Sequence, residues 1–159
     1  MEDAFFVFCA RYLFALPIVI LGIYFFMQPR EDWKRMAAFA VSAALLAYLI
    51  GVVGGLLYYD PRPFVVGHFT PLIPHASDNG FPSDHALLVS AVAMIGTIWN
   101  KKLGFVLWVL AALVAIARVY VGVHHTTDVA GSFVISVVAV SLVAIFVQRR
   151  SGKRYGGPE

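Results

Sequence analysis

The chain has 159 residues, of which 60% are hydrophobic and 13% charged, and its formal net charge is +3. Soluble domains carry roughly 25% charged residues, so this composition excludes a soluble globular protein and predicts an integral membrane protein. The small positive charge does not indicate a nucleic-acid partner, and the single cysteine, Cys9, excludes an intramolecular disulfide.

Five hydrophobic segments predict an all-α fold, a polytopic transmembrane bundle of about five spanning helices. The segments are Ala4–Met27, Met36–Tyr59, Ser83–Trp99, Leu103–Val121 and Val129–Val147. The third and fourth fall slightly short of the roughly 20 residues that a span needs, so we expect their ends to be buried in protein. In the second segment, Gly51 and Gly55 form a small-residue pair that predicts close helix packing. We expect residues 1–159 to form one membrane domain.

The two ends of the chain differ in character. The N-terminus begins Met1-Glu2-Asp3, without the positive region of a signal peptide, and the first apolar segment is too long for one. We therefore expect a retained helix, interrupted only by Arg11 and Pro17. The tail Gln148–Glu159 is basic and glycine-rich, and we expect it to be solvated or frayed.

Lysine and arginine are distributed unevenly over the loops, with nine of the twelve in one alternating set. This set comprises Gln28–Arg35, Asn100–Lys102 and the C-terminal tail, and the positive-inside rule places it in the cytoplasm. The N-terminus, the loop Asp60–Pro82 and the turn Gly122–Asp128 would then face outward. The predicted location is the inner (plasma) membrane, with a cytoplasmic C-terminus.

Three polar clusters fall in these outward-facing segments, together with all five histidines. They are Tyr58–Phe64 with Arg62; Gly80–Ala86 with Ser83, Asp84 and His85; and Ala117–Asp128 with Arg118, His124, His125 and Asp128. Ionisable residues at the edge of an apolar layer are costly and indicate function by default. Topology brings the three clusters to the same side of the membrane.

The residue types in these clusters fit the binding of a phosphate. Arg62 and Arg118 can clamp phosphate oxygens with paired, planar donors. Ser83 and Asp84 stand where a helix begins, and free backbone N–H groups there favour an anion.

The histidines fit catalysis on that phosphate. Two histidines in separate clusters can serve as a nucleophile and a general acid. His124 and Asp128 are four residues apart, so on one helix face the carboxylate can orient the imidazole.

Each cluster also has a structural alternative. Pro61-Arg62-Pro63 alone is typical of a rigid loop, the run from Pro82 to His85 of a helix cap, and Arg118 could snorkel to the interface. A histidine-rich face could bind zinc, but the spacing lacks His-x-x-x-His and cysteine ligands, and nearby arginines repel cations. Three clusters together favour phosphate chemistry, and we expect no metal and no cofactor.

The motifs resemble those of the type 2 phosphatidic acid phosphatase superfamily, over roughly residues 55–128. That family has Lys, six residues, Arg-Pro; then Pro-Ser-Gly-His; then Ser-Arg, five residues, His, three residues, Asp. Arg62-Pro63 matches the end of the first motif, Pro82-Ser83-Asp84-His85 the second with Asp for Gly, and Ala117-Arg118 with His124 and Asp128 the third with Ala for Ser.

The resemblance implies a catalytic role for three residues. His124 would attack phosphorus and form a phosphohistidine, Asp128 would orient it, and His85 would protonate the leaving oxygen. The implied mechanism uses no metal and stabilises the transferring group by positioning and charge.

The resemblance also implies a phosphate-binding set. Arg62, Arg118 and Ser83 would hold the phosphate, with Asp84 beside them at the start of the helix. The family's first-motif lysine falls on Gly55, so one phosphate contact is missing or supplied from elsewhere, with Arg11 and the loop histidines as candidates.

The string Phe81–Ala86 looks most like the undecaprenyl-diphosphatase branch, which hydrolyses a lipid diphosphate carrier on the outer face of the bacterial membrane. It implies hydrolysis of undecaprenyl diphosphate to undecaprenyl phosphate and phosphate. The loop Val65–Asn79, with His68, His75, Asp78 and Asn79, would cover the pocket or read the second phosphate, or be merely structural. Alternative substrates are phosphatidylglycerophosphate and phosphatidate. An alternative of another class is a non-catalytic lipid-phosphate binder or transporter.

Overall fold

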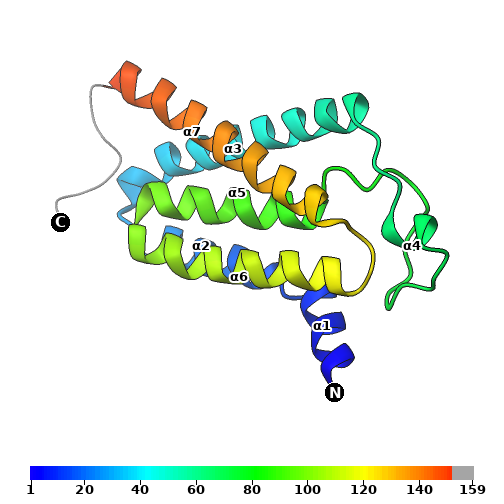
Figure 1. Cartoon of the computed structure of the whole chain (residues 1–159). Coiled ribbons are helices and arrows are strands. Elements are labelled where there is room, and N and C mark those ends of the chain that lie inside the picture. Colours follow the sequence, from blue (N-terminus) through cyan, green and yellow to red (C-terminus); the bar gives the residue numbers. More distant parts are fainter. Residues whose placement is uncertain (152–159) are drawn as a thin grey trace.

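The computed structural model describes residues 1–151, and these form a bundle of helices with no β-sheet in that range (Figure 1). The helices are α1 Glu2–Arg11, α2 Ala15–Phe26, α3 Arg30–Leu57, α4 Pro63–Val66, α5 Asp84–Trp99, α6 Lys101–Tyr120 and α7 Thr126–Ser151. Each of the five predicted hydrophobic segments is helical, which confirms the all-α class.

Helix α5 forms the centre of the bundle and packs against α6, α7, α3 and α2. Hydrogen bonds between buried serines join it to α7: Ser90 Oγ donates to Ser136 Oγ at 2.8 Å. On the α6 side, a Cβ atom at Gly104 would lie 2.5 Å from the Cα atom of Thr97. Small and hydroxyl-bearing residues therefore let neighbouring helices approach closely, as is typical of helices packed in lipid.

Three of the described helices, α3, α6 and α7, are long and apolar enough to cross a membrane, and the bent pair α1–α2 raises this number to as many as four. Helix α5 is a shorter apolar helix of 16 residues. At 1.5 Å per residue it extends only about 24 Å, less than the roughly 30 Å of a hydrocarbon core. The number of five spans therefore stays a prediction.

The predicted first helix is in fact two helices that meet at an angle of 49°. The break lies between Arg11 and Ala15, directly before Pro17. Proline has no N–H to donate to the carbonyl four residues earlier and its ring crowds that carbonyl. The Leu13 carbonyl accepts instead from Leu16 at 3.1 Å, a tighter turn that bends the chain.

Helix boundaries differ from the prediction at two other places. Helix α3 begins at Arg30, before the predicted Met36, because Glu31 and Asp32 in its first turn suit the positive end of the helix dipole. Helix α7 continues through Gln148 to Ser151, so this part of the tail is helical rather than frayed. The rest of the tail, residues 152–159, lies outside the described residues.

The two glycines predicted to permit close packing do so. A Cβ atom at Gly51 would lie 2.8 Å from Leu87 Cδ2, and one at Gly55 would lie 3.1 Å from the Phe81 carbonyl oxygen. Helix α3 can therefore lie against α5 and against the chain leading into it.

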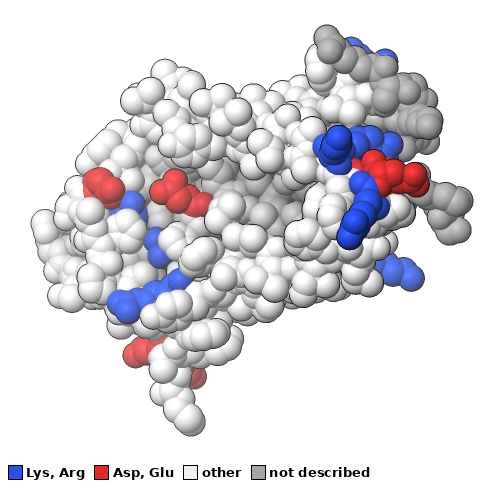
Figure 2. Space-filling model, turned by 180° about the vertical axis from the view of Figure 1, so that it is seen from behind, with Lys and Arg blue, Asp and Glu red and all other residues white. Residues whose placement is uncertain are grey.

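Charged side chains gather at two ends of the molecule and leave a wide uncharged band between them (Figure 2). One end carries the turns α2–α3 and α5–α6, and the other carries the end of α3, the start of α5 and the α6–α7 turn (Figure 1). The three polar clusters predicted to lie together thus meet at one end of the bundle.

Candidate active site

The α6–α7 turn directs His124 into the protein. Gly122 ends α6 with φ +81°, a conformation that side-chain-bearing residues rarely adopt. A Cβ atom there would also lie 2.6 Å from the ring of Phe69. Glycine at this position lets the chain reverse beneath Phe69, and His124 follows in the turn with only 3% of its surface exposed.

The imidazole of His124 is held by its Nδ1 atom. This atom lies 2.9 Å from the Gly80 carbonyl oxygen and 3.4 Å from Asp128 Oδ2. Both oxygens can only accept a hydrogen bond, so Nδ1 carries the proton in the neutral ring. The lone pair is then on Nε2.

Two guanidinium groups surround that free nitrogen. His124 Nε2 lies 3.3 Å from Arg62 Nη1 and 3.4 Å from Arg118 Nη2. Two buried cations beside one neutral nitrogen strongly favour the binding of an anion at this point.

Burial lowers the pKa of His124, and the charges of Arg118 and Arg62 lower it further, while the hydrogen bond and the charge of Asp128 act in the opposite direction. The net shift is downward. His124 is therefore neutral at pH 7, the form with a lone pair for nucleophilic attack.

Arg62 is fixed by three partners besides His124. Nη1 donates to the Val123 carbonyl at 2.8 Å, Nη2 to the Asn79 carbonyl at 3.2 Å, and Nε to Asp78 Oδ1 at 2.7 Å. Burial alone would raise the pKa of Asp78, but the hydrogen bond and charge of Arg62 outweigh it and lower that pKa. Asp78 is thus an ionised partner that holds the Arg62 guanidinium in a fixed orientation.

Arg118, on the last turn of α6, is also buried, with 4% of its surface exposed. Its Nη1 donates to the Ala10 carbonyl at 3.4 Å, and its Nη2 lies 3.1 Å from His75 Nε2. The side chain therefore points inward and does not snorkel to the interface. Its Nε has no hydrogen-bond partner within residues 1–151.

Asp128 lies completely buried in the first turn of α7. Its Oδ2 accepts a hydrogen bond from the His125 N–H at 2.8 Å, shorter than its 3.4 Å approach to His124. A Cβ atom at Gly80 would lie 2.9 Å from the same oxygen. The carboxylate thus shapes the turn that carries His124, and the Gly80 carbonyl is the nearer partner of the ring.

Ser83 and Asp84 stand at the N-terminus of α5. Ser83 is the N-cap residue and is fully buried, yet its Oγ has no hydrogen-bond partner in the described part of the chain. Ser132 Oγ donates to the Ser83 carbonyl at 3.1 Å and ties this end of α5 to α7. An unpaired hydroxyl beside free backbone N–H groups suits an anion. The side chain of Asp84 is exposed.

His85 approaches the site from the side of α2. Its ring is half-buried and meets the ring of Phe14 edge-on, with 5.0 Å between centroids. Among the described residues it makes no hydrogen bond with His124.

Asn79 was expected only as a member of the loop that would cover the pocket, and its bridging role was not predicted from the sequence. Its Oδ1 accepts hydrogen bonds from the N–H groups of Asp60 and Phe81, and its Nδ2 donates to the carbonyls of Gly55 and Tyr58, all within 2.9–3.0 Å. One amide therefore joins the end of α3 to both ends of the loop between Asp60 and Phe81. The only sequence signal was an asparagine before glycine, which is typical of turns.

The position of the missing motif lysine is occupied by close backbone contacts. At Gly55 the helix meets the Phe81 carbonyl, and the Gly55 carbonyl accepts from Asn79. Ala117, the other departure, is fully buried in an apolar cluster with Cys9 and Ala10 of α1. Small residues at both positions permit tight packing around the site.

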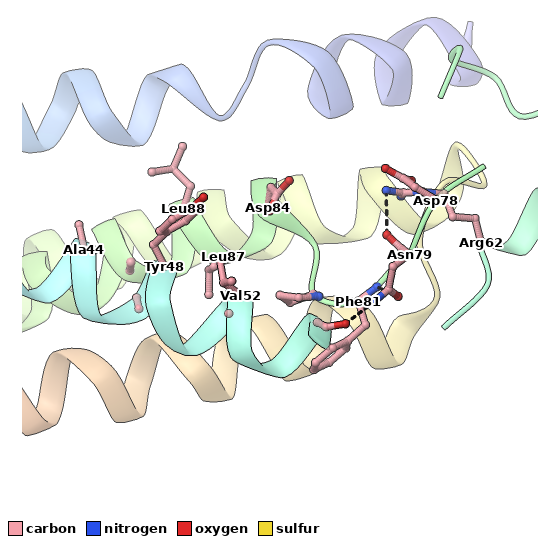
Figure 3. A pocket seen from close by; sticks show the side chains of 15 residues that line it. Ala44, Tyr48, Val52, Arg62, Asp78, Asn79, Phe81, Asp84, Leu87 and Leu88 are labelled. Atoms are coloured by element: carbon pink, nitrogen blue, oxygen red, sulfur yellow. Dashed lines mark hydrogen bonds and ion pairs between the residues drawn. The ribbon is translucent and has the colours of Figure 1, made fainter. Parts of the chain in front are cut away.

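A groove of about 510 Å³ runs between α3 and α5 and reaches this site (Figure 3). On α3 it is lined by the small residues Ala44, Ala47, Gly51 and Gly55 together with Tyr48 and Val52. Arg62 and Asp84 lie among its polar lining. A second cavity of about 430 Å³ opens on the other side, between the loop around Phe69 and His124. Arg62 therefore links the apolar groove to the buried histidine.

Within residues 1–151 no group of three or more His, Cys, Asp or Glu side chains is placed to hold a metal ion. The expectation of metal-free chemistry stays a prediction.

Comparison with known proteins gives consistent matches. Residues 36–151 match the model of the PAP2 superfamily. The chain is 33% identical to undecaprenyl-diphosphatase BcrC of Bacillus subtilis over 139 residues, which are 86% of this chain and 70% of that protein. Among solved structures, LpxE of Aquifex aeolicus has a TM-score of 0.72 at 22% identity, covering 89% of this chain and 84% of that one. A transmembrane phosphatidylglycerolphosphate phosphatase from Bacillus subtilis has a TM-score of 0.67 at 26% identity, covering 96% and 80%. A helical membrane protein with these motifs, matched over most of its length, belongs to the PAP2 superfamily of phosphatases.

Proposed function

We propose that this protein hydrolyses undecaprenyl diphosphate to undecaprenyl phosphate and inorganic phosphate through a phosphohistidine at His124. The observation that carries the proposal is the environment of His124 Nε2, a neutral, buried nitrogen within 3.4 Å of two guanidinium groups. A phosphoryl group drawn in by those cations would place its phosphorus beside the nitrogen lone pair.

The reaction would proceed in two steps. In the first, His124 Nε2 forms a bond to the terminal phosphorus and the P–O bond to the lipid phosphate breaks. His85, which would be protonated while the negatively charged diphosphate is bound, gives its proton to the departing oxygen. In the second, water attacks the phosphorus, the P–N bond breaks, and His85 takes up the proton that the water loses. Inorganic phosphate leaves and both histidines return to their starting states.

The remaining residues would hold the phosphoryl group. Arg62 and Arg118 neutralise its oxygens, and the unpaired Ser83 hydroxyl donates to one of them. Asp84 contributes its backbone N–H at the start of α5, while its exposed carboxylate stays in the groove. Asp128 keeps the turn and the tautomer of His124 in place.

The lipid tail would lie in the groove between α3 and α5. This groove, with a volume of about 510 Å³, has four small residues on its α3 side, which leaves room for an apolar chain, and its polar end contains Arg62. Away from the charged ends of the molecule, Figure 2 shows a wide band of surface without charged side chains. The tail could thus stay at the depth of the membrane while the head group reaches the site.

We infer that the site faces the extracytoplasmic side of the inner membrane and that the C-terminus is cytoplasmic. The support is the charge distribution, since Lys34, Arg35, Lys101 and Lys102 lie at the end of the bundle opposite the site.

Phosphatidylglycerophosphate is the second candidate substrate, because one of the similar structures is a phosphatidylglycerolphosphate phosphatase. Phosphatidate would need the same site. A non-catalytic lipid-phosphate binder would bind these lipids without releasing phosphate.

The experiment is phosphate release from the purified protein with undecaprenyl diphosphate, phosphatidylglycerophosphate and phosphatidate, each with and without a chelator. We expect release from the diphosphate to be fastest, to persist with chelator, and to be abolished by His124→Ala. The matched control is His68→Asn, which removes an exposed histidine of the loop. Asparagine tolerates the φ of +51° at this position. Release that survives His124→Ala would refute the nucleophile, and binding without release would favour the non-catalytic alternative.

A further inference from the structure

The loop that precedes α5 is pinned at two points. On one side, Ile73 is 3% exposed and packs in a core with Ala10, Ala117 and Val123, and the Leu72 N–H donates to the Val121 carbonyl at 3.0 Å. On the other side, Asn79 makes its four side-chain hydrogen bonds. The residues between the pins are therefore held at a defined place over the site.

Each arginine of the site receives one side chain from this pinned segment. Asp78 Oδ1 lies 2.7 Å from Arg62 Nε, and His75 Nε2 lies 3.1 Å from Arg118 Nη2. The ring centroid of His75 is 6.1 Å from that of His124. The Nε2 atoms of His75 and His124 thus face the same Arg118 nitrogen, at 3.1 and 3.4 Å, although His75 does not belong to any of the three sequence clusters.

The hydrogen bonds of His75 define its state in the empty site. Its Nδ1 lies 3.4 Å from the Ala76 carbonyl, an acceptor, and Arg118 can only donate, so His75 is neutral with its lone pair on Nε2. Burial lowers the pKa of His75, as do the charges of Arg62 and Arg118, and the hydrogen bond to the Ala76 carbonyl only partly offsets this. The segment's own carboxylate, Asp78, is engaged by Arg62.

A bound phosphate would reverse this balance. A phosphoryl group carries charge on three terminal oxygens, whereas Arg62 and Arg118 are the two cations at His124 Nε2 in the described chain. When Arg118 turns its N–H groups to a phosphate oxygen, His75 Nε2 loses its donor and faces negative charge. That charge favours a protonated ring, which can donate to the same phosphate.

We propose that His75 is a third phosphate-binding side chain, neutral in the empty site and protonated when phosphate binds. This inference rests on the function proposed above. It makes phosphate binding take up a proton, so the contribution of His75 is present at low pH and is lost as the pH rises through the pKa of the phosphate-bound state. The charged and titratable groups that face His75 are Arg62, Arg118, His124, His85 and Asp78.

The test is binding of inorganic phosphate to the purified full-length protein in detergent, at pH 6 and pH 8, by calorimetry. Wild type is compared with His75→Gln, which keeps a neutral donor, and with His75→Lys, which keeps a charge at both pH values. Ionisation of phosphate and of His124 is common to all variants, so it cancels when their dissociation constants for phosphate are divided by one another at the same pH. The matched control is His68→Asn, the exposed histidine of the same loop.

We expect wild type to bind phosphate at least about 3-fold more tightly than His75→Gln at pH 6, because a rise of about one pKa unit gives its full factor of 10 only at a pH below both pKa values of His75. At pH 8 the two should bind equally, while His75→Lys binds more tightly than both. His68→Asn should match wild type at both pH values. The inference would be overturned if the ratio of the dissociation constants of wild type and His75→Gln were the same at pH 6 and pH 8.

Phosphate release from undecaprenyl diphosphate by the same preparations separates this inference from the proposed function. Release by wild type together with a pH-independent ratio overturns the role of His75 and leaves the function standing. A pH-dependent ratio without release of phosphate from any lipid supports His75 as a phosphate ligand and refutes the hydrolase.

Discussion

At the scale of single residues, the site combines motif side chains with backbone groups that no motif records. Arg62, Arg118, His124 and Asp128 come together as their spacing predicts. The nearest partner of the His124 ring is the carbonyl of Gly80, and every residue type has such a carbonyl. Backbone acceptors therefore could not be predicted from sequence, whereas charged side chains in an apolar chain could.

The lowered pKa of His124 leads to a prediction about pH. Only the neutral ring can attack, so kcat/KM should fall as the pH falls through the pKa of His124 in the free enzyme. Because that pKa lies below its ordinary value of about 6.5, the midpoint of the acid limb should lie below 6.5. The profile is best measured in His75→Gln, which removes a second titration, and corrected for substrate ionisation. An acid limb centred above pH 6.5 would contradict the assignment.

Asn79 leads to a prediction about both stability and activity. Asn79→Ala removes four hydrogen bonds that join α3 to the loop and displaces the backbone carbonyl that holds Arg62. We expect a loss of about 2 to 4 kcal/mol in the free energy of unfolding, with a raised KM. Asn100→Ala is the control, since Asn100 caps α6 at the opposite end. It should destabilise by about 1 kcal/mol and leave KM unchanged. Equal KM values in the two variants would refute the role of Asn79.

At the scale of elements, apolar blocks predict where helices lie but not how they bend or meet. The break before Pro17 turns α1 so that its Ala10 carbonyl reaches Arg118. A continuous helix from Ala4 to Met27 would lack this bend. The proline was visible in the sequence, but proline in a membrane helix is compatible with a kink or with continuity, so only tertiary packing decides.

Close contact between α5 and α6 leads to a stability prediction. In Gly104→Ala the new methyl group would lie 2.5 Å from the Cα atom of Thr97, a backbone atom that cannot move alone. Overpacking of this kind costs about 1 to 3 kcal/mol, which should lower the melting temperature in detergent. Gly22→Ala is the matched control, because its methyl group would meet no atom within 4 Å. It should leave stability unchanged or raise it slightly. Equal changes in melting temperature for the two variants would contradict the close contact between α5 and α6 at Gly104.

At the scale of the whole molecule, one end of the bundle carries the basic turns and the other carries the site (Figure 2). This separation was predictable because the positive charges are sparse and nine of the twelve lie in one alternating set of loops. The number of spans was not, since α5 is too short by itself and is covered by its neighbours. Cys9 and Ala10 of α1 share a core with Ala117 of α6, so we infer that the described chain acts as one domain.

The central claim is that His124 carries the phosphoryl group, and trapping that intermediate tests it most directly. Purified protein is mixed with undecaprenyl diphosphate labelled at the terminal phosphate, quenched in alkali within milliseconds, and digested for peptide mass analysis. We expect phosphate on the His124 imidazole in wild type, none in His124→Ala, and undiminished label in His68→Asn. Label on another residue, or steady release of phosphate from His124→Ala, would contradict the account.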